Sequence, residues 1–97
     1  MRLKDKVALI TGAGKRSGIG FAIARAFSRE SAHIVLADLC QDLDGFDQYY
    51  RLSRWEELQQ LAQEISAAGV QTLPIRVDVT DESSVKAMVK SVEEAFG

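Results

Sequence analysis

A glycine-rich run at residues 11–20 has the composition and spacing of a phosphate-binding turn. It reads Thr-Gly-Ala-Gly-Lys-Arg-Ser-Gly-Ile-Gly, follows the apolar segment Val7–Ile10 and precedes apolar residues at helical spacing. A turn that joins a strand to a helix directs unpaired backbone N–H groups and the positive end of the helix dipole toward one point. We therefore expect the pyrophosphate of a dinucleotide to bind there.

The glycines in this run suit different tasks. Gly12 can turn sharply out of the strand, Gly18 lets the backbone approach the phosphates, and Gly20 leaves room for the helix against the strand. The strict G-x-G-x-x-G pattern is absent, because Ser17 stands where the third glycine would be. Taken alone, the run is also consistent with glycines that only connect a strand to a helix.

An acidic residue at the end of the next apolar run adds to the case for a dinucleotide. Asp38 follows His33–Ala37 and lies near the offset of about 20 residues at which an acid binds the adenosine ribose. A carboxylate accepts hydrogen bonds from the 2′-hydroxyl and repels a 2′-phosphate, so Asp38 favours NAD over NADP. Lys15 and Arg16 are consistent with two interpretations. They are either solvated cations of the loop or cations that contact a phosphate, and the second interpretation allows NADP as well as NAD.

The elements around these residues predict an α/β fold. The strands are expected near residues 7–10, 33–37 and 72–77, and each precedes a helical pattern. Pro74 cannot donate a ladder hydrogen bond and is tolerated mainly on an edge strand, which agrees with a 3-2-1 strand order. We expect a Rossmann-like, three-layer αβα arrangement on a parallel sheet, built from three βα units.

Apolar residues at helical spacing mark the three helices. We expect Ser53 and Glu56 to form a capping box, Trp55 to belong to the core, and Thr80 or Asp81 to cap the last helix. The apolar positions are Ile19, Ala22, Ile23, Ala26 and Phe27 in the first helix, Trp55, Leu58, Leu61, Ala62 and Ile65 in the second, and Val85, Met88, Val89, Val92 and Phe96 in the third.

Three motifs in this order resemble the short-chain dehydrogenase/reductase family across essentially the whole chain. They are Thr11-Gly12 with Gly18-Ile19-Gly20, Ala37-Asp38-Leu39, and Asp78-Val79-Thr80-Asp81. The resemblance implies that Asp78 lies near the adenine amino group and Val79 against the ring, although Asp78 also suits a helix cap. The expected cofactor-binding residues are Gly12, Lys15, Arg16, Ser17, Gly18, Ile19, Gly20, Asp38, Leu39, Asp78 and Val79.

The resemblance also implies an activity. Members of the family are NAD(P)-dependent oxidoreductases that move a hydride between nicotinamide and a carbonyl or alcohol carbon of a small molecule. The longer loop between Gly12 and Gly18 is similar to that of enoyl-thioester reductases, which gives an alternative reaction. Ser31 stands where the family usually has glycine. The insertion Cys40–Leu52, with Phe46, Tyr49 and Tyr50, either covers the adenine, contacts another subunit or forms a surface excursion.

The catalytic residues of the family lie beyond the region that this chain matches. Tyr49 and Tyr50 lack a lysine four residues later, and His33 has no acid-base or metal-binding partner, so we assign no catalytic residue. We expect residues 1–97 to form a single partial dinucleotide-binding domain that lacks the C-terminal catalytic half and is inactive alone. The first strand would then have one unpaired edge. A catalytically inactive nucleotide-binding or assembly module is the alternative.

The composition of the chain argues against several classes of binding partner. The chain has 12 basic and 14 acidic side chains and a net charge of −2, which does not suit a nucleic-acid surface. It has no apolar run of membrane-spanning length and no signal-peptide core, so we expect a cytoplasmic protein without membrane contact. A single cysteine, Cys40, and the Asp spacing of the insertion predict no metal site. We expect a homo-oligomer.

Overall fold

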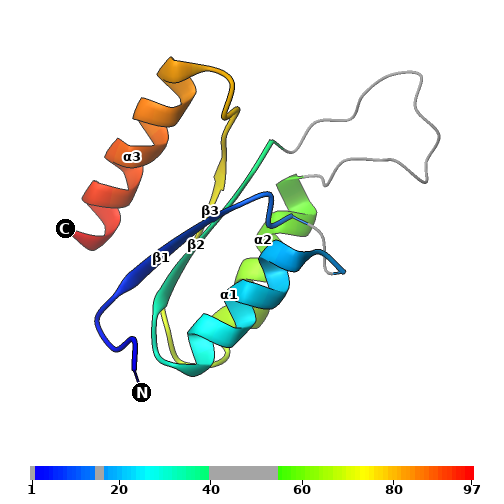
Figure 1. Cartoon of the computed structure of the whole chain (residues 1–97), viewed down its shortest axis with the longest axis vertical. Coiled ribbons are helices and arrows are strands. Elements are labelled where there is room, and N and C mark those ends of the chain that lie inside the picture. Colours follow the sequence, from blue (N-terminus) through cyan, green and yellow to red (C-terminus); the bar gives the residue numbers. More distant parts are fainter. Residues whose placement is uncertain (1, 15–16, 40–54) are drawn as a thin grey trace.

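The computed structural model describes residues 2–14, 17–39 and 55–97. Strands and helices alternate along these residues, and the strands form one parallel sheet (Figure 1). The elements are β1 (Val7–Thr11), α1 (Ile19–Arg29), β2 (His33–Asp38), α2 (Trp55–Ser66), β3 (Thr72–Arg76) and α3 (Glu82–Phe96). This alternation confirms the predicted α/β fold with three βα units.

The sheet has the order β1-β2-β3, which confirms the predicted 3-2-1 arrangement. The central strand β2 pairs with β1 from Val7 opposite His33 to Thr11 opposite Ala37. Pro74 lies in β3, at the edge, where its missing N–H costs no ladder hydrogen bond. Among the described residues β1 pairs only with β2, so its other edge has the unpaired backbone that the sequence predicts.

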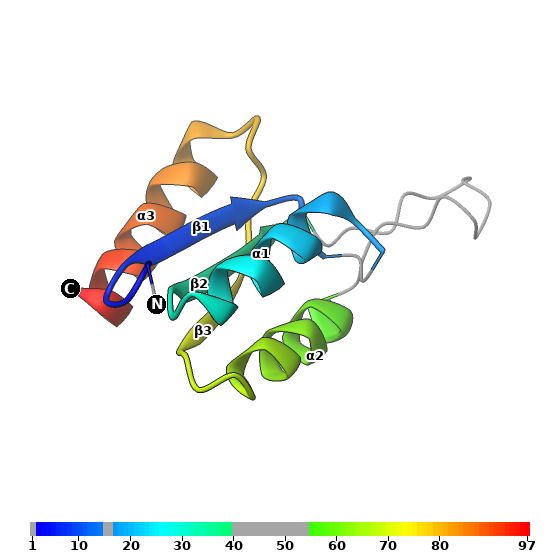
Figure 2. The ribbon, with the colours of Figure 1, turned by 60° about the horizontal axis from the view of Figure 1, so that its bottom comes forward.

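Helices cover both faces of the sheet. Figure 2 shows α1 and α2 side by side on one face and α3 on the other, which confirms the three-layer arrangement. The larger core lies under α1 and α2 and includes the fully buried Ile34 and Leu36 of β2. The smaller core lies under α3 and centres on Ala37, Val77 and Met88. Alternate residues of a strand therefore enter different cores, as the pleat requires.

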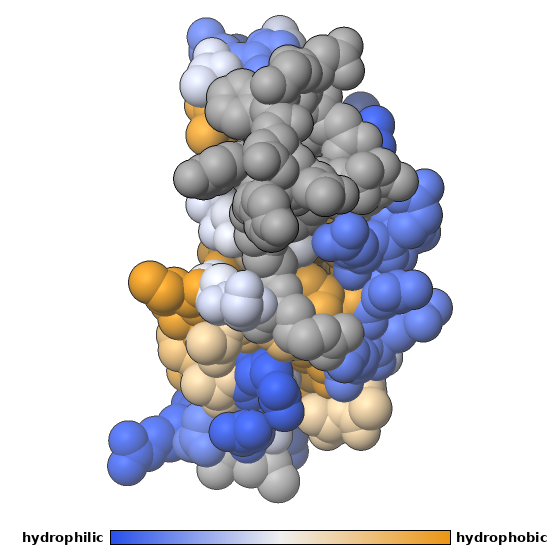
Figure 3. Space-filling view, turned by 90° about the vertical axis from the view of Figure 1, so that its right-hand side faces the viewer, coloured by the Kyte–Doolittle hydropathy of each residue, from blue (hydrophilic) through white to orange (hydrophobic). Residues whose placement is uncertain are grey.

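The residues of the apolar stripe confirm the helix α1, but they are not its buried residues. Its buried residues are Phe21, Ala24 and Ser28, whereas Ile19 is 82% exposed and Phe27 is 39% exposed. Gly20 packs closely against the glycine turn, and with the helix in this rotation Phe21 and Ala24 enter the core under α1 and α2. The apolar stripe seen in the sequence lies on the outer side of α1, and hydrophobic residues are visible at the surface in Figure 3.

In the other two helices, the buried residues belong to the apolar stripe seen in the sequence. In α2 the buried residues are Leu58, Leu61, Ala62 and Ile65, as predicted, and Trp55 packs half-buried against the same core. The proposed capping residue Ser53 lies outside the described residues. In α3 only Met88 is buried. The cap of α3 is Asp81, whose carboxylate accepts a hydrogen bond from the Ser83 N–H at 2.9 Å.

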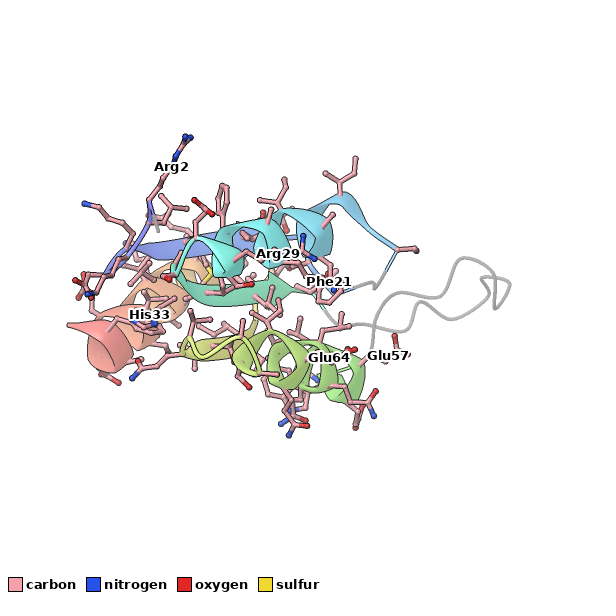
Figure 4. The ribbon with its side chains drawn as sticks, turned by 90° about the horizontal axis from the view of Figure 1, so that it is seen from below. Arg2, Phe21, Arg29, His33, Glu57 and Glu64 are labelled. Atoms are coloured by element: carbon pink, nitrogen blue, oxygen red, sulfur yellow. The ribbon has the colours of Figure 1, made fainter. Side chains whose placement is uncertain are left out.

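The turn that follows the C-cap of α1 contains a residue with left-handed backbone. Ser31 has φ 71°, a conformation that glycine adopts without strain, so the departure noted in the sequence falls on a position that favours glycine. His33 follows and has the structural role expected for it. Its Nδ1 accepts the Gln71 N–H at 3.0 Å, and its ring stacks on Phe96 beside the end of α3 (Figure 4).

Candidate functional site

The carboxyl ends of the three parallel strands meet at one edge of the sheet and enclose a cavity. Its volume is about 330 Å³. Ligands of open α/β sheets bind outside the carboxyl ends of the strands, so this is the position that the fold favours for a site. The lining residues are Thr11 and Gly12 at the end of β1, Asp38 and Leu39 at the end of β2, and Val77, Asp78, Val79 and Thr80 after β3.

The glycine turn depends on two residues that cannot carry a side chain without cost. Gly12 has φ 66°, in the left-handed region, where the chain turns out of β1. A Cβ on Gly20 would lie 3.0 Å from the Gly12 carbonyl oxygen and 3.2 Å from the Ala13 Cα. Both groups are backbone, so they cannot rotate away. The start of α1 therefore packs directly on the turn, with Gly18 as its N-cap.

Asp38 is bonded to the glycine turn. Its Oδ2 accepts a hydrogen bond from the Gly14 N–H at 2.8 Å, across 24 residues of sequence. The side chain points toward the layer of α1 and α2, on the same side of β2 as Ile34 and Leu36. The carboxylate thus holds the backbone of the turn in place at the edge of the cavity, which the sequence pattern did not reveal.

Asp78 is held by its own loop. Its Oδ1 accepts hydrogen bonds from the Thr80 hydroxyl at 2.6 Å and from the Thr80 N–H at 2.9 Å, and its backbone N–H donates to the Ser84 hydroxyl. The hydroxyl bond, and then the backbone bond, lower the pKa of Asp78 below its ordinary value because they stabilise the carboxylate. A negative charge is thereby maintained at the cavity.

Removal of the Thr80 hydroxyl is expected to raise the pKa of Asp78. A carboxyl whose pKa is lowered by folding stabilises the fold above its ordinary pKa of 3.8, and this contribution is lost as the pH falls through the lowered value. In Thr80→Val the Asp78 carboxyl is expected to take up its proton at higher pH, so the stabilising contribution is also lost at higher pH. NMR titration of this carboxyl between about pH 2 and 6 measures the change in pKa. Ser66→Ala removes a hydroxyl bonded elsewhere and serves as the control. An unchanged titration in Thr80→Val contradicts the assignment.

Two apolar side chains of the predicted set are largely exposed. Val79 lines the cavity and is 63% exposed, and Ile19, at the start of α1, is 82% exposed. Exposed apolar residues beside a cavity are suited to contact the flat or apolar parts of a ligand. Ser17 is also exposed and lies immediately before the cap of α1.

Some predicted residues lie outside the described part of the chain. They are Lys15, Arg16 and the insertion Cys40–Leu52 with its aromatic residues. The structure adds other lining residues that are not among the predicted cofactor-binding residues. Thr11, Val77 and Thr80 line the cavity, and their position next to the motif residues was the available signal. Arg76 ends β3, with its guanidinium 5.9 Å from the centre of the Trp55 ring.

The described residues contain neither a cluster of metal ligands nor a membrane-spanning helix. Within residues 2–14, 17–39 and 55–97, no three histidine, cysteine, aspartate or glutamate residues are grouped as metal ligands would be. In that same part of the chain, none of the helices has the length and apolar character needed to cross a membrane.

Comparison with known proteins identifies the family. Galactitol 2-dehydrogenase of Agrobacterium fabrum is 35% identical over the whole chain, which spans 30% of that protein. Carveol dehydrogenase of Mycobacterium avium, solved with NAD, matches 99% of the chain with a TM-score of 0.84 and 30% identity; the chain covers 33% of it. L-sorbose reductase of Gluconobacter frateurii, solved with NADPH and L-sorbose, matches the whole chain with a TM-score of 0.75 and 36% identity; the chain covers 32% of it.

The chain thus spans about a third of the length of these proteins. The family model described as short chain dehydrogenase matches residues 6–97, which include the glycine turn, Asp38 and Asp78. Since this match covers nearly the whole sequence, the chain belongs to the short chain dehydrogenase family.

Proposed function

We propose that this chain forms the cofactor-binding part of an NAD(P)-dependent oxidoreductase and prefers NAD. When bound, the nicotinamide cofactor supplies or accepts a hydride, which the intact enzyme exchanges with a carbonyl or alcohol carbon of a small molecule. The chain's own residues bind and orient the cofactor. The catalytic and substrate-binding residues belong to the part of the family's sequence that this chain does not match.

The contact between Asp38 and the glycine turn carries this proposal. The Gly14 N–H bond places a carboxylate beside the turn that would hold the pyrophosphate, so one edge offers groups for ribose and phosphate together. The start of α1 lies close to the turn, as phosphate binding needs, because the backbone of Gly12 and Ala13 leaves no space for a Cβ on Gly20. In this arrangement Gly12, Ser17, Gly18, Ile19 and Gly20 surround the pyrophosphate, with Lys15 and Arg16 in the same loop.

The other ends of the strands suit the adenosine. Asp38 accepts hydrogen bonds from the ribose hydroxyls, and Leu39 follows it along the same cavity. Asp78 lies where its carboxylate can accept a hydrogen bond from the adenine amino group, and the exposed Val79 offers an apolar surface to the ring. The carboxylate of Asp38 disfavours a 2′-phosphate, which is why we propose NAD as the preferred cofactor.

The relatives support the type of reaction. Galactitol 2-dehydrogenase and L-sorbose reductase are named for reactions of an alcohol and of a carbonyl compound, and the solved neighbours hold NAD or NADPH. The shared region is the one that contains the proposed cofactor site.

Titration of the 97-residue chain with NAD and NADP by calorimetry tests the proposal. We expect saturable binding of both, with NAD bound more tightly. Circular dichroism shows whether the chain is folded, and size-exclusion chromatography in the same buffer tests the expected homo-oligomer. A folded chain that binds neither dinucleotide would overturn the proposed function.

A further inference from the structure

We propose that Arg76 determines how the adenosine end of this site tolerates a phosphate on the 2′-hydroxyl. The inference rests on the proposed function and adds a residue that the motifs do not contain. In this arrangement Asp38 gives the preference for NAD, and Arg76 supplies the positive charge that allows a 2′-phosphorylated nucleotide to bind as well.

The register of the sheet places Arg76 next to Asp38. The two residues are partners across β2 and β3, so their backbones lie on neighbouring strands about 4.8 Å apart. Their side chains leave the sheet on the same side. Thr72 lies four residues before Arg76 in β3, so both side chains point to the same face of the sheet. The Thr72 hydroxyl donates a hydrogen bond to the Ala62 carbonyl of α2, and the Arg76 side chain lies against Trp55 at the start of α2.

The Trp55 ring holds the guanidinium in a form that can bind a phosphate. The guanidinium carbon lies 5.9 Å from the ring centre, within the range of a cation–π contact. An aromatic ring occupies the flat face of a guanidinium, whereas the N–H donors point outward from its edges. Among the described residues, Trp55 and Arg76 line a cavity of about 280 Å³, so the guanidinium lies beside open space.

The charges at this edge of the sheet single out Arg76. Three cavities open there: the strand-end cavity, the one lined by Trp55 and Arg76, and one lined by Gly14, Glu57, Gln60 and Leu61. Glu57 is labelled near the start of α2 in Figure 4. Of the described residues that line these cavities, Arg76 alone is positively charged, whereas Asp38, Asp78 and Glu57 are negative. Without Arg76, a 2′-phosphate would meet only like charges from this set.

A pair of nucleotides that differ by one phosphate tests the proposal. Adenosine 5′-monophosphate and adenosine 2′,5′-bisphosphate are titrated into the 97-residue chain by calorimetry, with the fluorescence of its single tryptophan, Trp55, as a second readout. In Arg76→Gln we expect the affinity for the bisphosphate to fall roughly tenfold or more, as for the loss of a hydrogen-bonded charge, and the affinity for the monophosphate to change less than about twofold. Arg76→Lys keeps the charge without the planar donors and is expected to lie between wild type and Arg76→Gln.

Arg25→Gln is the matched control. Arg25 also lies over an aromatic ring, with its guanidinium carbon 6.0 Å from the centre of Phe21, and its removal changes the net charge equally. It lines a different cavity, between α1 and α2, so we expect the affinities of both nucleotides to change by less than about twofold.

Each other result overturns the inference. Equal loss of bisphosphate binding in Arg25→Gln and Arg76→Gln would show a general effect of charge. Unchanged bisphosphate binding in Arg76→Gln, or a wild-type chain that binds only the monophosphate, would reject the role of Arg76 and leave the proposed function standing. A folded wild-type chain that binds neither nucleotide would overturn the proposed function and this inference together.

Discussion

Replacement of Gly20 by valine is expected to abolish dinucleotide binding, with a loss of affinity of more than about 100-fold, or roughly 3 kcal/mol. The first side-chain carbon alone would lie 3.0 Å from the Gly12 carbonyl oxygen, and the two methyl groups of valine add further overlap. Because the opposing atoms are backbone, α1 must move away from the end of β1, and the N–H groups that would meet the pyrophosphate move with it. Overpacking of this kind also costs about 1–3 kcal/mol of folding stability.

Calorimetric titration with NAD measures the loss of affinity, and thermal unfolding measures the loss of stability. Ala22→Val is the control, since it places valine on the same helix at an exposed position and reproduces its lower helix propensity. Normal NAD affinity in a folded Gly20→Val chain would show that the pyrophosphate does not bind at this turn.

Replacement of Asp38 by alanine is expected to weaken NAD binding roughly 10- to 100-fold and NADP binding less. The change removes the acceptor of the Gly14 N–H and of the ribose hydroxyls, and hydrogen bonds to a charged group are each worth about 1.5–3 kcal/mol. NADP loses the same anchoring of the turn, but its 2′-phosphate is relieved of repulsion by the carboxylate. The ratio of NAD to NADP affinity should therefore fall.

Paired titrations with the two dinucleotides measure this ratio. Asp81→Ala removes a carboxylate that caps α3 and lines none of the cavities at the sheet edge, so it controls for the change in net charge. Asp38→Asn retains an oxygen that can accept the Gly14 N–H and separates anchoring of the turn from charge. Equal weakening of NAD and NADP in Asp38→Ala would reject the assignment of Asp38 to the ribose.

Much of the fold was predictable because it depends on local patterns. The buried residues of α2 recur every three or four positions, so one face of that helix is apolar and its orientation follows from the sequence. In α1 the apolar stripe of the sequence is not the buried face, because Phe21, Ala24 and Ser28 are buried instead. The close packing of Gly20 on the glycine turn is a contact between separate elements, and such a contact leaves no periodic signal.

The candidate site was predictable to a similar extent. The glycine turn, Asp38 and Asp78 each lie at or just beyond the end of a strand. Parallel strands bring such ends to one edge, so their meeting follows from the order of elements. The bond between Asp38 and Gly14 spans 24 residues and depends on the exact register of β1 and β2. The register of β2 and β3 likewise brings Arg76 beside Asp38.

By itself, the sequence determined which residues form strands, helices and turns, and which residue types stand at the strand ends, because these features depend on neighbours within a few positions. The tertiary structure decided which face of α1 is buried and which charged groups become neighbours. Asp38, Gly14 and Arg76 are far apart along the chain, and only strand register and helix packing bring them to one edge. A shift of one residue in that register would turn each side chain to the opposite face of the sheet, so the site exists only once the sheet has formed.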